Sequence, residues 1–274
     1  MGRRISHIQG FTLIELSIVL VIIGLLVGGV LTGQDLIKSA TVRAQISQIE
    51  KYNTAVNTFQ GKYDALPGDM DLATANRFGF NTLMCDGSMG ARDGNGLLDG
   101  YFLMPLVQGF GEVQLFWQDL SSVNLIDGTF PNGAAVFACN TSDPAHWQTN
   151  IGQWLPVAKI GYGNFVYVYE FSGKNWYGVS ATIEMSVNPA SGTTIPVAMA
   201  YNIDKKIDDG LPTTGNVQAL YLGADFTATT PMLAPNAAAD GTTTCYNTGG
   251  SAAAYSIGYQ GGALTTCALS FRFQ

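Results

Sequence analysis

Charged side chains are scarce in this sequence, making up 12% of 274 residues, and there are two histidines, His7 and His146. A Ser-His-Asp or Cys-His catalytic system would therefore depend on a single residue. No stretch gathers Lys and Arg, and the formal net charge is −7 at pH 7. Because so acidic a surface repels phosphate backbones, the composition argues against nucleic-acid binding as well as against such a hydrolase.

Cysteine is also sparse, and no two cysteines are close enough for a CxxC metal or redox motif. Four cysteines allow three disulfide connectivities. We favour the sequential pairing because each bridge then encloses a short loop, while four buried free thiols remain the alternative. The favoured bridges are Cys85–Cys139 and Cys245–Cys267.

The N-terminal part of the chain contains a long apolar run in which Glu15 is the only formal charge between Phe11 and Leu31. This length is close to the roughly 20 helical residues that cross a bilayer core. Arg3 and Arg4 precede the run, so the positive-inside rule keeps the N-terminus in the cytoplasm and sends the remainder across. A cleaved secretory signal peptide is the competing interpretation, but no convincing cleavage site follows Leu31.

A second helical pattern follows the apolar run, and no proline between residues 11 and 66 interrupts either one. Its apolar residues recur at steps of three, four or seven, with polar residues such as Gln45 and Gln48 between them. The Pro-Gly-Asp sequence at 67–69 then stops the helix. We expect one helix from Phe11 to about Tyr63, with one apolar stripe buried. That stripe consists of Val42, Ile46, Ile49, Val56, Phe59 and Tyr63.

The rest of the chain predicts an antiparallel sheet. "GNFVYVYEF" alternates its aromatic residues, 172–175 form a turn, and "WYGVSATIEM" returns as the second strand of a hairpin. "PVAMAYNID", "VQALYL" and "ALSFRF" are further strand candidates, "GEVQLFWQDL" is a short amphipathic helix, and 224–264 are surface loops with little to bury. The fold class is therefore α+β, with the sheet packed on the stripe of the long helix.

The carboxylate of Glu15 is unexpected in an apolar segment. Insertion scales put the cost of an acidic residue at mid-membrane at roughly 2.5 to 3.5 kcal/mol, less near an end. The side chain could simply reach the membrane interface. Alternatively it has a cationic partner at the same depth, which cleavage between Gly10 and Phe11 would supply as a free α-amino group, largely protonated at neutral pH.

The string GFTLIEL at residues 10–16, after a short basic leader and before an apolar run, resembles the type IV pilin and type II secretion pseudopilin family. This match covers about the first 35 residues of the chain. It implies that prepilin peptidase cleaves after Gly10 and that the new Phe11 amine is methylated. It also implies that Glu15 pairs with the Phe11 amine of a neighbouring subunit during assembly.

The same resemblance implies a structural subunit without enzymatic activity or cofactor. Expected partners are other pilins or pseudopilins, prepilin peptidase and the inner-membrane assembly platform. The subunit would lie in the bacterial inner membrane before assembly, and afterwards in a periplasmic pseudopilus or a cell-surface pilus. The alternative is a single-pass anchored periplasmic binding or adhesive domain that does not polymerise. The expected segments are a leader (1–10), a transmembrane helix (11–33), an amphipathic helix (34–66) and a globular domain (67–274).

A metal site is a further expectation from the family resemblance. Major pseudopilins place a calcium site in a late acidic loop, and "NIDKKIDDGLP" is such a loop in this sequence. Its carboxylates are Asp204, Asp208 and Asp209. Carboxylate oxygens are ligands that calcium prefers, so these three residues are the candidate ligands.

Overall fold

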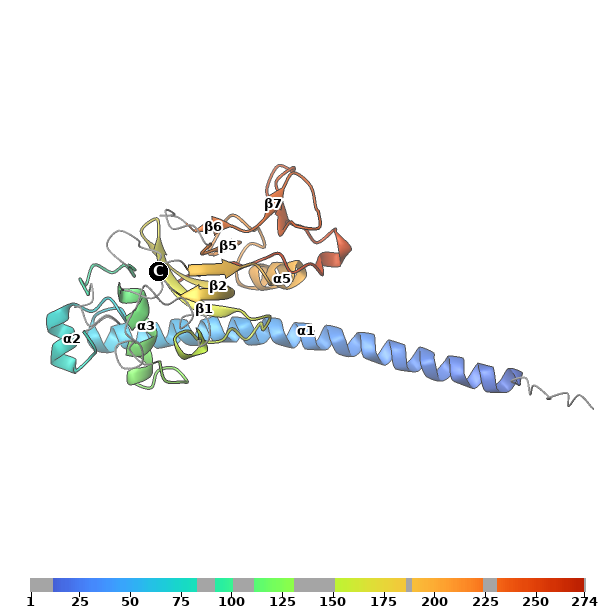
Figure 1. The fold of residues 1–274 in the computed structure, drawn as a ribbon, viewed down its shortest axis with the longest axis horizontal. Coiled ribbons are helices and arrows are strands. Elements are labelled where there is room, and N and C mark those ends of the chain that lie inside the picture. Colours follow the sequence, from blue (N-terminus) through green and yellow to red (C-terminus); the bar gives the residue numbers. More distant parts are fainter. Residues whose placement is uncertain are drawn as a thin grey trace, which may run out of the picture. The chain divides into compact units, whose positions relative to one another are not determined.

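The computed structural model describes residues 12–82, 92–100, 111–130, 151–185, 189–223 and 231–273. The chain divides into two compact units, Met1–Thr41 and Val42–Gln274, and we call the second unit the head. Helix α1 (Leu13–Tyr63) begins in the first unit and ends in the head (Figure 1). The long helix and the antiparallel strands of the head confirm the expected α+β class.

Within the head, α1 buries one stripe, whose members follow one another at steps of one, three or four residues, as on one face of a helix. Gln45 and Gln48 belong to this stripe, so their expected position on the polar side of the helix is wrong. They are buried because their amide groups bond to the backbone of residues 157–160. Gln45 Oε1 accepts from the Ile160 amide at 2.9 Å, and Gln48 Oε1 accepts from the Lys159 amide at 2.9 Å. The buried residues are Val42, Gln45, Gln48, Ile49, Tyr52, Ala55, Val56, Phe59 and Tyr63.

Two short helices cover the end of α1 in the head. Helix α2 (Leu72–Phe78) begins at Asp71, whose Oδ1 accepts from the second and third amides of the turn, and ends at Gly79 in the left-handed conformation. Helix α3 (Gly111–Ser122) is the amphipathic helix expected from the sequence. Its Trp117 ring lies 4.9 Å from the Tyr52 ring of α1, so aromatic side chains join the two helices.

The main sheet has the strand order β1-β2-β10-β4, with β3 also paired to β2, and every pairing is antiparallel. The expected hairpin is present, but its turn has two residues rather than four. Ser172 and Gly173 have φ of 55° and 70°, which matches the right-handed twist of the flanking strands. The bounds are β1 (Phe165–Phe171), β2 (Lys174–Met185), β3 (Pro189–Gly192), β4 (Val217–Gln218) and β10 (Leu269–Arg272).

The segment "PVAMAYNID" is a helix, not the strand that the sequence predicted. Helix α5 (Val197–Ile207) starts after Pro196, whose fixed φ suits a helix start. Its first four residues, Val-Ala-Met-Ala, are a short apolar run that is compatible with a strand. The buried positions instead include Val197, Ala200 and Ile203, which follow helical spacing.

The C-terminal loops contain more buried side chains than their composition suggested. Tyr246 and Tyr255 are 1% and 3% exposed, so the expectation that 224–264 have little to bury is wrong for the described part. Tyr246 lies in β8 and Tyr255 in β9, and the described residues from 220 to 255 form five two-residue strands. They are β5 (Leu220–Tyr221), β6 (Met232–Leu233), β7 (Asn236–Ala237), β8 (Tyr246–Asn247) and β9 (Ala254–Tyr255); the 3₁₀ turns are η2 (Ile151–Gln153) and η3 (Gln260–Gly262).

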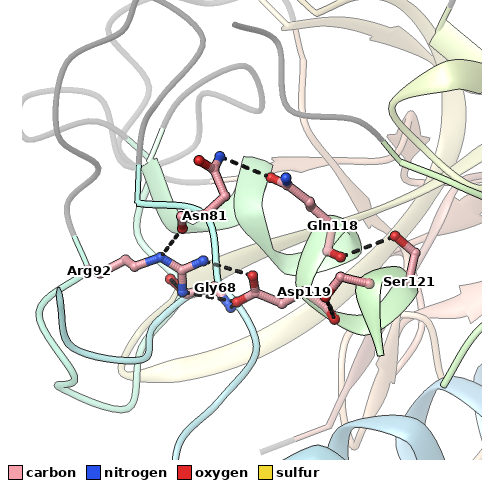
Figure 2. Close-up of polar contacts among 7 residues, drawn as sticks. Gly68, Asn81, Arg92, Gln118, Asp119 and Ser121 are labelled. Carbon is pink, nitrogen blue, oxygen red and sulfur yellow. Dashed lines mark hydrogen bonds and ion pairs between the residues drawn. The ribbon is translucent and has the colours of Figure 1, made fainter. Parts of the chain in front are cut away.

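A buried ion pair joins four segments of the head. The Arg92 and Asp119 side chains are 0% and 1% exposed, and Arg92 Nη2 lies 2.7 Å from Asp119 Oδ1 (Figure 2). Arg92 also donates to the carbonyls of Gly68 and Asn81, and the Gly68 amide donates to Asp119 Oδ2 at 2.8 Å. The pair therefore ties α3 to the turn after α1 and to the segment after α2.

Candidate functional site

Glu15 forms a capping box with Thr12 at the start of α1. The backbone amide and the hydroxyl of Thr12 both donate to Glu15 Oε2 at 2.8 Å, and the Glu15 amide donates to Thr12 Oγ1 at 3.3 Å. These contacts satisfy amides that the first turn of a helix leaves without partners. The chain therefore gives the Glu15 carboxylate local partners before any neighbouring subunit is considered.

The helix that carries Glu15 presents apolar side chains in all directions over the first unit. Its large apolar residues from Leu13 to Ile37 are more than half exposed. Within the described residues, α1 is long and apolar enough to cross a membrane. A helix that is apolar all round needs lipid or other protein to cover it.

Several residues of interest lie outside the described part of the chain. Gly10 and Phe11, the expected cleavage site and methylated residue, precede it. The expected Cys85–Cys139 bridge and the histidines His7 and His146 also lie outside the described residues.

A comparison with family models decides how this N-terminal segment is interpreted. The model of the prokaryotic N-terminal methylation motif matches residues 5–31, which include Gly10, Phe11 and Glu15. The chain carries a prepilin-type N-terminus. This motif is the signature of type IV pilin and pseudopilin precursors that prepilin peptidase processes. Searches of curated proteins and of solved structures give no match to the chain.

The prepilin motif supports a pilin-like precursor, from a family of structural subunits rather than enzymes. It implies processing by prepilin peptidase and assembly with pilin-type subunits. Together with the apolar helix, it supports anchoring in a membrane. The match ends at residue 31, so the head has to be described from its own residues.

The acidic loop after α5 brings together the three expected calcium ligands. One carboxylate oxygen from each of Asp204, Asp208 and Asp209 lies within 4.8 Å of the other two. Asp204 is buried, with Oδ1 accepting from the Gly210 amide at 3.0 Å and Oδ2 accepting from the Tyr255 hydroxyl at 2.8 Å. Burial raises the pKa of Asp204 to about 7, although both hydrogen bonds oppose this shift.

The other two carboxylates also stabilise the loop itself. Asp208 Oδ2 accepts from the Asn216 and Val217 amides. Asp209 accepts from the Leu211 amide at 2.8 Å and from the Thr214 hydroxyl at 2.6 Å. The loop fits calcium in ligand type and charge, and a bound ion would use the lone pairs that these bonds leave free.

We expect calcium to raise the melting temperature of the head, because an ion bound only to the folded state stabilises it. The measurement is thermal unfolding of the full chain in detergent, in millimolar calcium and in chelator. Asp209→Asn should lose most of the shift, whereas Asp35→Asn, a change to an exposed residue on α1, should keep it. If calcium causes no shift in the unsubstituted chain, the three carboxylates only stabilise turns.

The Cys245–Cys267 bridge links β8 to the segment before β10. The two Cα atoms are 4.8 Å apart, and both cysteines are buried. This is one of the two pairings favoured from the sequence. In the chain-entropy model, closing a loop of this size restricts the unfolded chain by about 3 kcal/mol.

Sequence reasoning missed Thr12 as a partner of Glu15, although the signal was present. Thr12 and Glu15 have the Ser/Thr-x-x-Glu spacing of a capping box ahead of an apolar run. It missed the contacts of Gln45 and Gln48 because no local pattern indicates that a polar residue will be buried against a distant backbone segment.

Proposed function

We propose that the chain is a pilin or pseudopilin that assembles through α1 into a type IV pilus or a type II secretion pseudopilus. The observation that carries this proposal is the methylation motif at 5–31, which has one carboxylate, Glu15, in an otherwise apolar helix start. The apolar surface of residues 13–31 supports storage in the inner membrane before assembly. No step of this function requires a catalytic centre.

In this proposal, cleavage after Gly10 creates the cation that Glu15 needs. The new amine of Phe11, once methylated, still carries a positive charge at neutral pH. Within an assembled filament, the amine of one subunit would meet the Glu15 carboxylate of its neighbour. The Glu15 carboxylate, which is energetically unfavourable in the membrane in an isolated subunit, would then fix the axial position of the incoming subunit.

The capping box suggests a second role for Glu15, and the two roles can be separated. Gln at this position still completes a capping box but carries no charge. Ala removes both the cap and the charge. Glu15→Gln is therefore the informative variant, because it keeps the local contacts to Thr12 and removes the proposed ionic pairing.

We expect Glu15→Ala and Glu15→Gln to be inserted and cleaved but to enter filaments poorly. Removing one partner of a buried ion pair costs roughly 3 to 5 kcal/mol, enough to abolish competitive incorporation. The measurements are mass spectrometry for loss of residues 1–10 and immunogold labelling of sheared filaments for incorporation. Glu50→Gln, an exposed position on the same helix, is the control.

Two outcomes would contradict the proposed pairing. Normal incorporation of both Glu15 variants would mean that the carboxylate has no role in assembly. Normal incorporation of Glu15→Gln alone would assign Glu15 to helix capping.

A separate outcome concerns the proposed function as a whole. An unsubstituted chain that is cleaved but stays monomeric in the membrane would favour the anchored binding or adhesive domain.

A further inference from the structure

Two buried carboxyl groups meet where the turn after α1 approaches the start of α3. Asp69 is 2% exposed and Glu112 is 0% exposed. One carboxylate oxygen of each and one of the exposed Asp93 lie within 4.8 Å of one another. Two ionised carboxylates at this separation and burial would repel each other strongly.

These two carboxyl groups hold one loop by its backbone. Asp69 accepts from the amides of Asn95 at 3.0 Å and Gly96 at 2.9 Å. Glu112 accepts from the amides of Asp93 at 3.1 Å and Asp99 at 3.0 Å. Four amides of the 93–99 loop thus depend on two acids from distant parts of the chain.

The 93–99 loop also contributes to the core of the head. The Leu98 side chain is fully buried, and its amide donates to Asn175 Oδ1 on β2 at 2.9 Å. The side-chain amide of Asn175 donates to the Gly96 carbonyl at 2.9 Å. Opening of the loop would therefore expose Leu98 and remove contacts to the first residues of β2.

We propose that Asp69 and Glu112 share one proton and act as a pH switch, which keeps the 93–99 loop closed at neutral pH and releases it in alkaline solution. With one proton between them, the pair carries a single negative charge and can accept all four amide bonds. When that proton leaves, two buried negative charges and the nearby Asp93 repel one another, and solvation of the carboxylates favours opening.

The pKa shifts of both groups agree with this geometry. Burial raises the pKa of Glu112 to about 9 and that of Asp69 to about 6, and the hydrogen bond from Glu112 opposes the shift of Asp69. The other charged groups on the elements that meet here are Asp71, Arg92, Asp99 and Asp119. The Arg92 guanidinium is held by Asp119, so it does not neutralise the pair.

The direction of the pH effect follows from proton linkage. In the unfolded chain Glu112 loses its proton near its ordinary pKa of 4.5, whereas in the folded head it keeps the proton until about 9. The folded state therefore binds more protons than the unfolded state between these values, and stability falls as the pH rises. The unfolding equilibrium constant should increase by up to about tenfold for each pH unit in this window.

The test is hydrogen exchange of the 93–99 loop, measured by mass spectrometry on the full chain in detergent. After correction for intrinsic exchange, the loop should lose at least about tenfold of its protection between about pH 5 and about pH 9. Glu112→Gln and Asp69→Asn should each remove most of this pH dependence. Both variants lose one amide acceptor and start less protected, so the readout is the change with pH rather than the absolute protection. Glu50→Gln should behave as the unsubstituted chain.

Three results would overturn the proposal. The first is equal corrected protection of the loop at both pH values. The second is an unchanged pH dependence in Glu112→Gln and Asp69→Asn. The third is a rise in melting temperature on calcium addition that disappears in Glu112→Gln, because a cation rather than a shared proton would then hold the two carboxyl groups together.

Discussion

Replacing Arg92 by methionine is expected to lower the free energy of unfolding of the head by about 3 to 5 kcal/mol. Methionine fills much of the volume of the arginine side chain but leaves Asp119 charged, buried and without its cation. The substitution also removes the donors to the Gly68 and Asn81 carbonyls. Chemical denaturation of the full chain in detergent, followed by the fluorescence of Trp117 and the other tryptophans, measures the loss.

Two variants separate the buried charge from the lost packing. Arg43→Met, at an exposed position on α1, should change stability by less than about 0.5 kcal/mol. The double change Arg92→Met with Asp119→Leu should be less destabilising than the sum of the single changes, since no uncompensated charge remains. A loss below about 1 kcal/mol for Arg92→Met, as for an exposed pair, would show that the ion pair is not buried in solution.

The Arg92 variant should also respond to pH. Burial raises the pKa of Asp119, and the hydrogen bonds from Arg92 oppose this. Without Arg92, the carboxyl group holds its proton more tightly in the folded than in the unfolded state. The loss of stability should therefore shrink as the pH falls towards the ordinary carboxyl range.

The second large effect is expected for Gly178→Ala in the centre of the main sheet. A Cβ atom at this position would lie 2.0 Å from Cε2 of the Tyr167 ring. Strand β2 cannot move aside, because Gly178 pairs with Tyr167 of β1 and with Ser270 of β10. The Tyr167 hydroxyl accepts from the Ser180 hydroxyl and the Leu222 amide, which fixes the ring. We expect a loss of about 3 kcal/mol, at the upper end for overpacking.

The control for Gly178→Ala is Gly61→Ala on α1, where a Cβ atom would have nothing within 4 Å. Alanine in a helix is favoured over glycine by about 0.5 to 1 kcal/mol, so this variant should be neutral or more stable. Adding Tyr167→Leu to Gly178→Ala should cost less than the two separate losses. An unchanged denaturation midpoint for Gly178→Ala would contradict the contact with the Tyr167 ring.

The N-terminal helix was predictable because its determinants are local. An apolar run, a following stripe at helical spacing and a Pro-Gly turn together define α1, and the GFTLIEL string indicates the class of protein. The hairpin of β1 and β2 was equally visible in its alternating aromatic residues. In each case the pattern extends over enough consecutive residues to distinguish helix from strand.

The remaining features depend on residues far apart in the sequence. Arg92 and Asp119 are 27 residues apart. Asp69 lies in the turn after α1 and Glu112 at the start of α3, and the two side chains lie close together. No local periodicity predicts which buried acid will find a cation and which will share a proton with another acid. Helix α5 was predicted as a strand because it begins with a short apolar run, and so short a run does not distinguish a helix from a strand.

The bonds from Gln45 and Gln48 to residues 157–160 affect which backbone groups of the head remain available to another copy. These side chains bond to three backbone groups of the segment whose Val157 bridges to Phe165, the first residue of β1. Their partners are side chains of a helix, which cannot extend the sheet. When heads are held at high local concentration, these three backbone groups are already bonded and do not pair with a strand of another molecule.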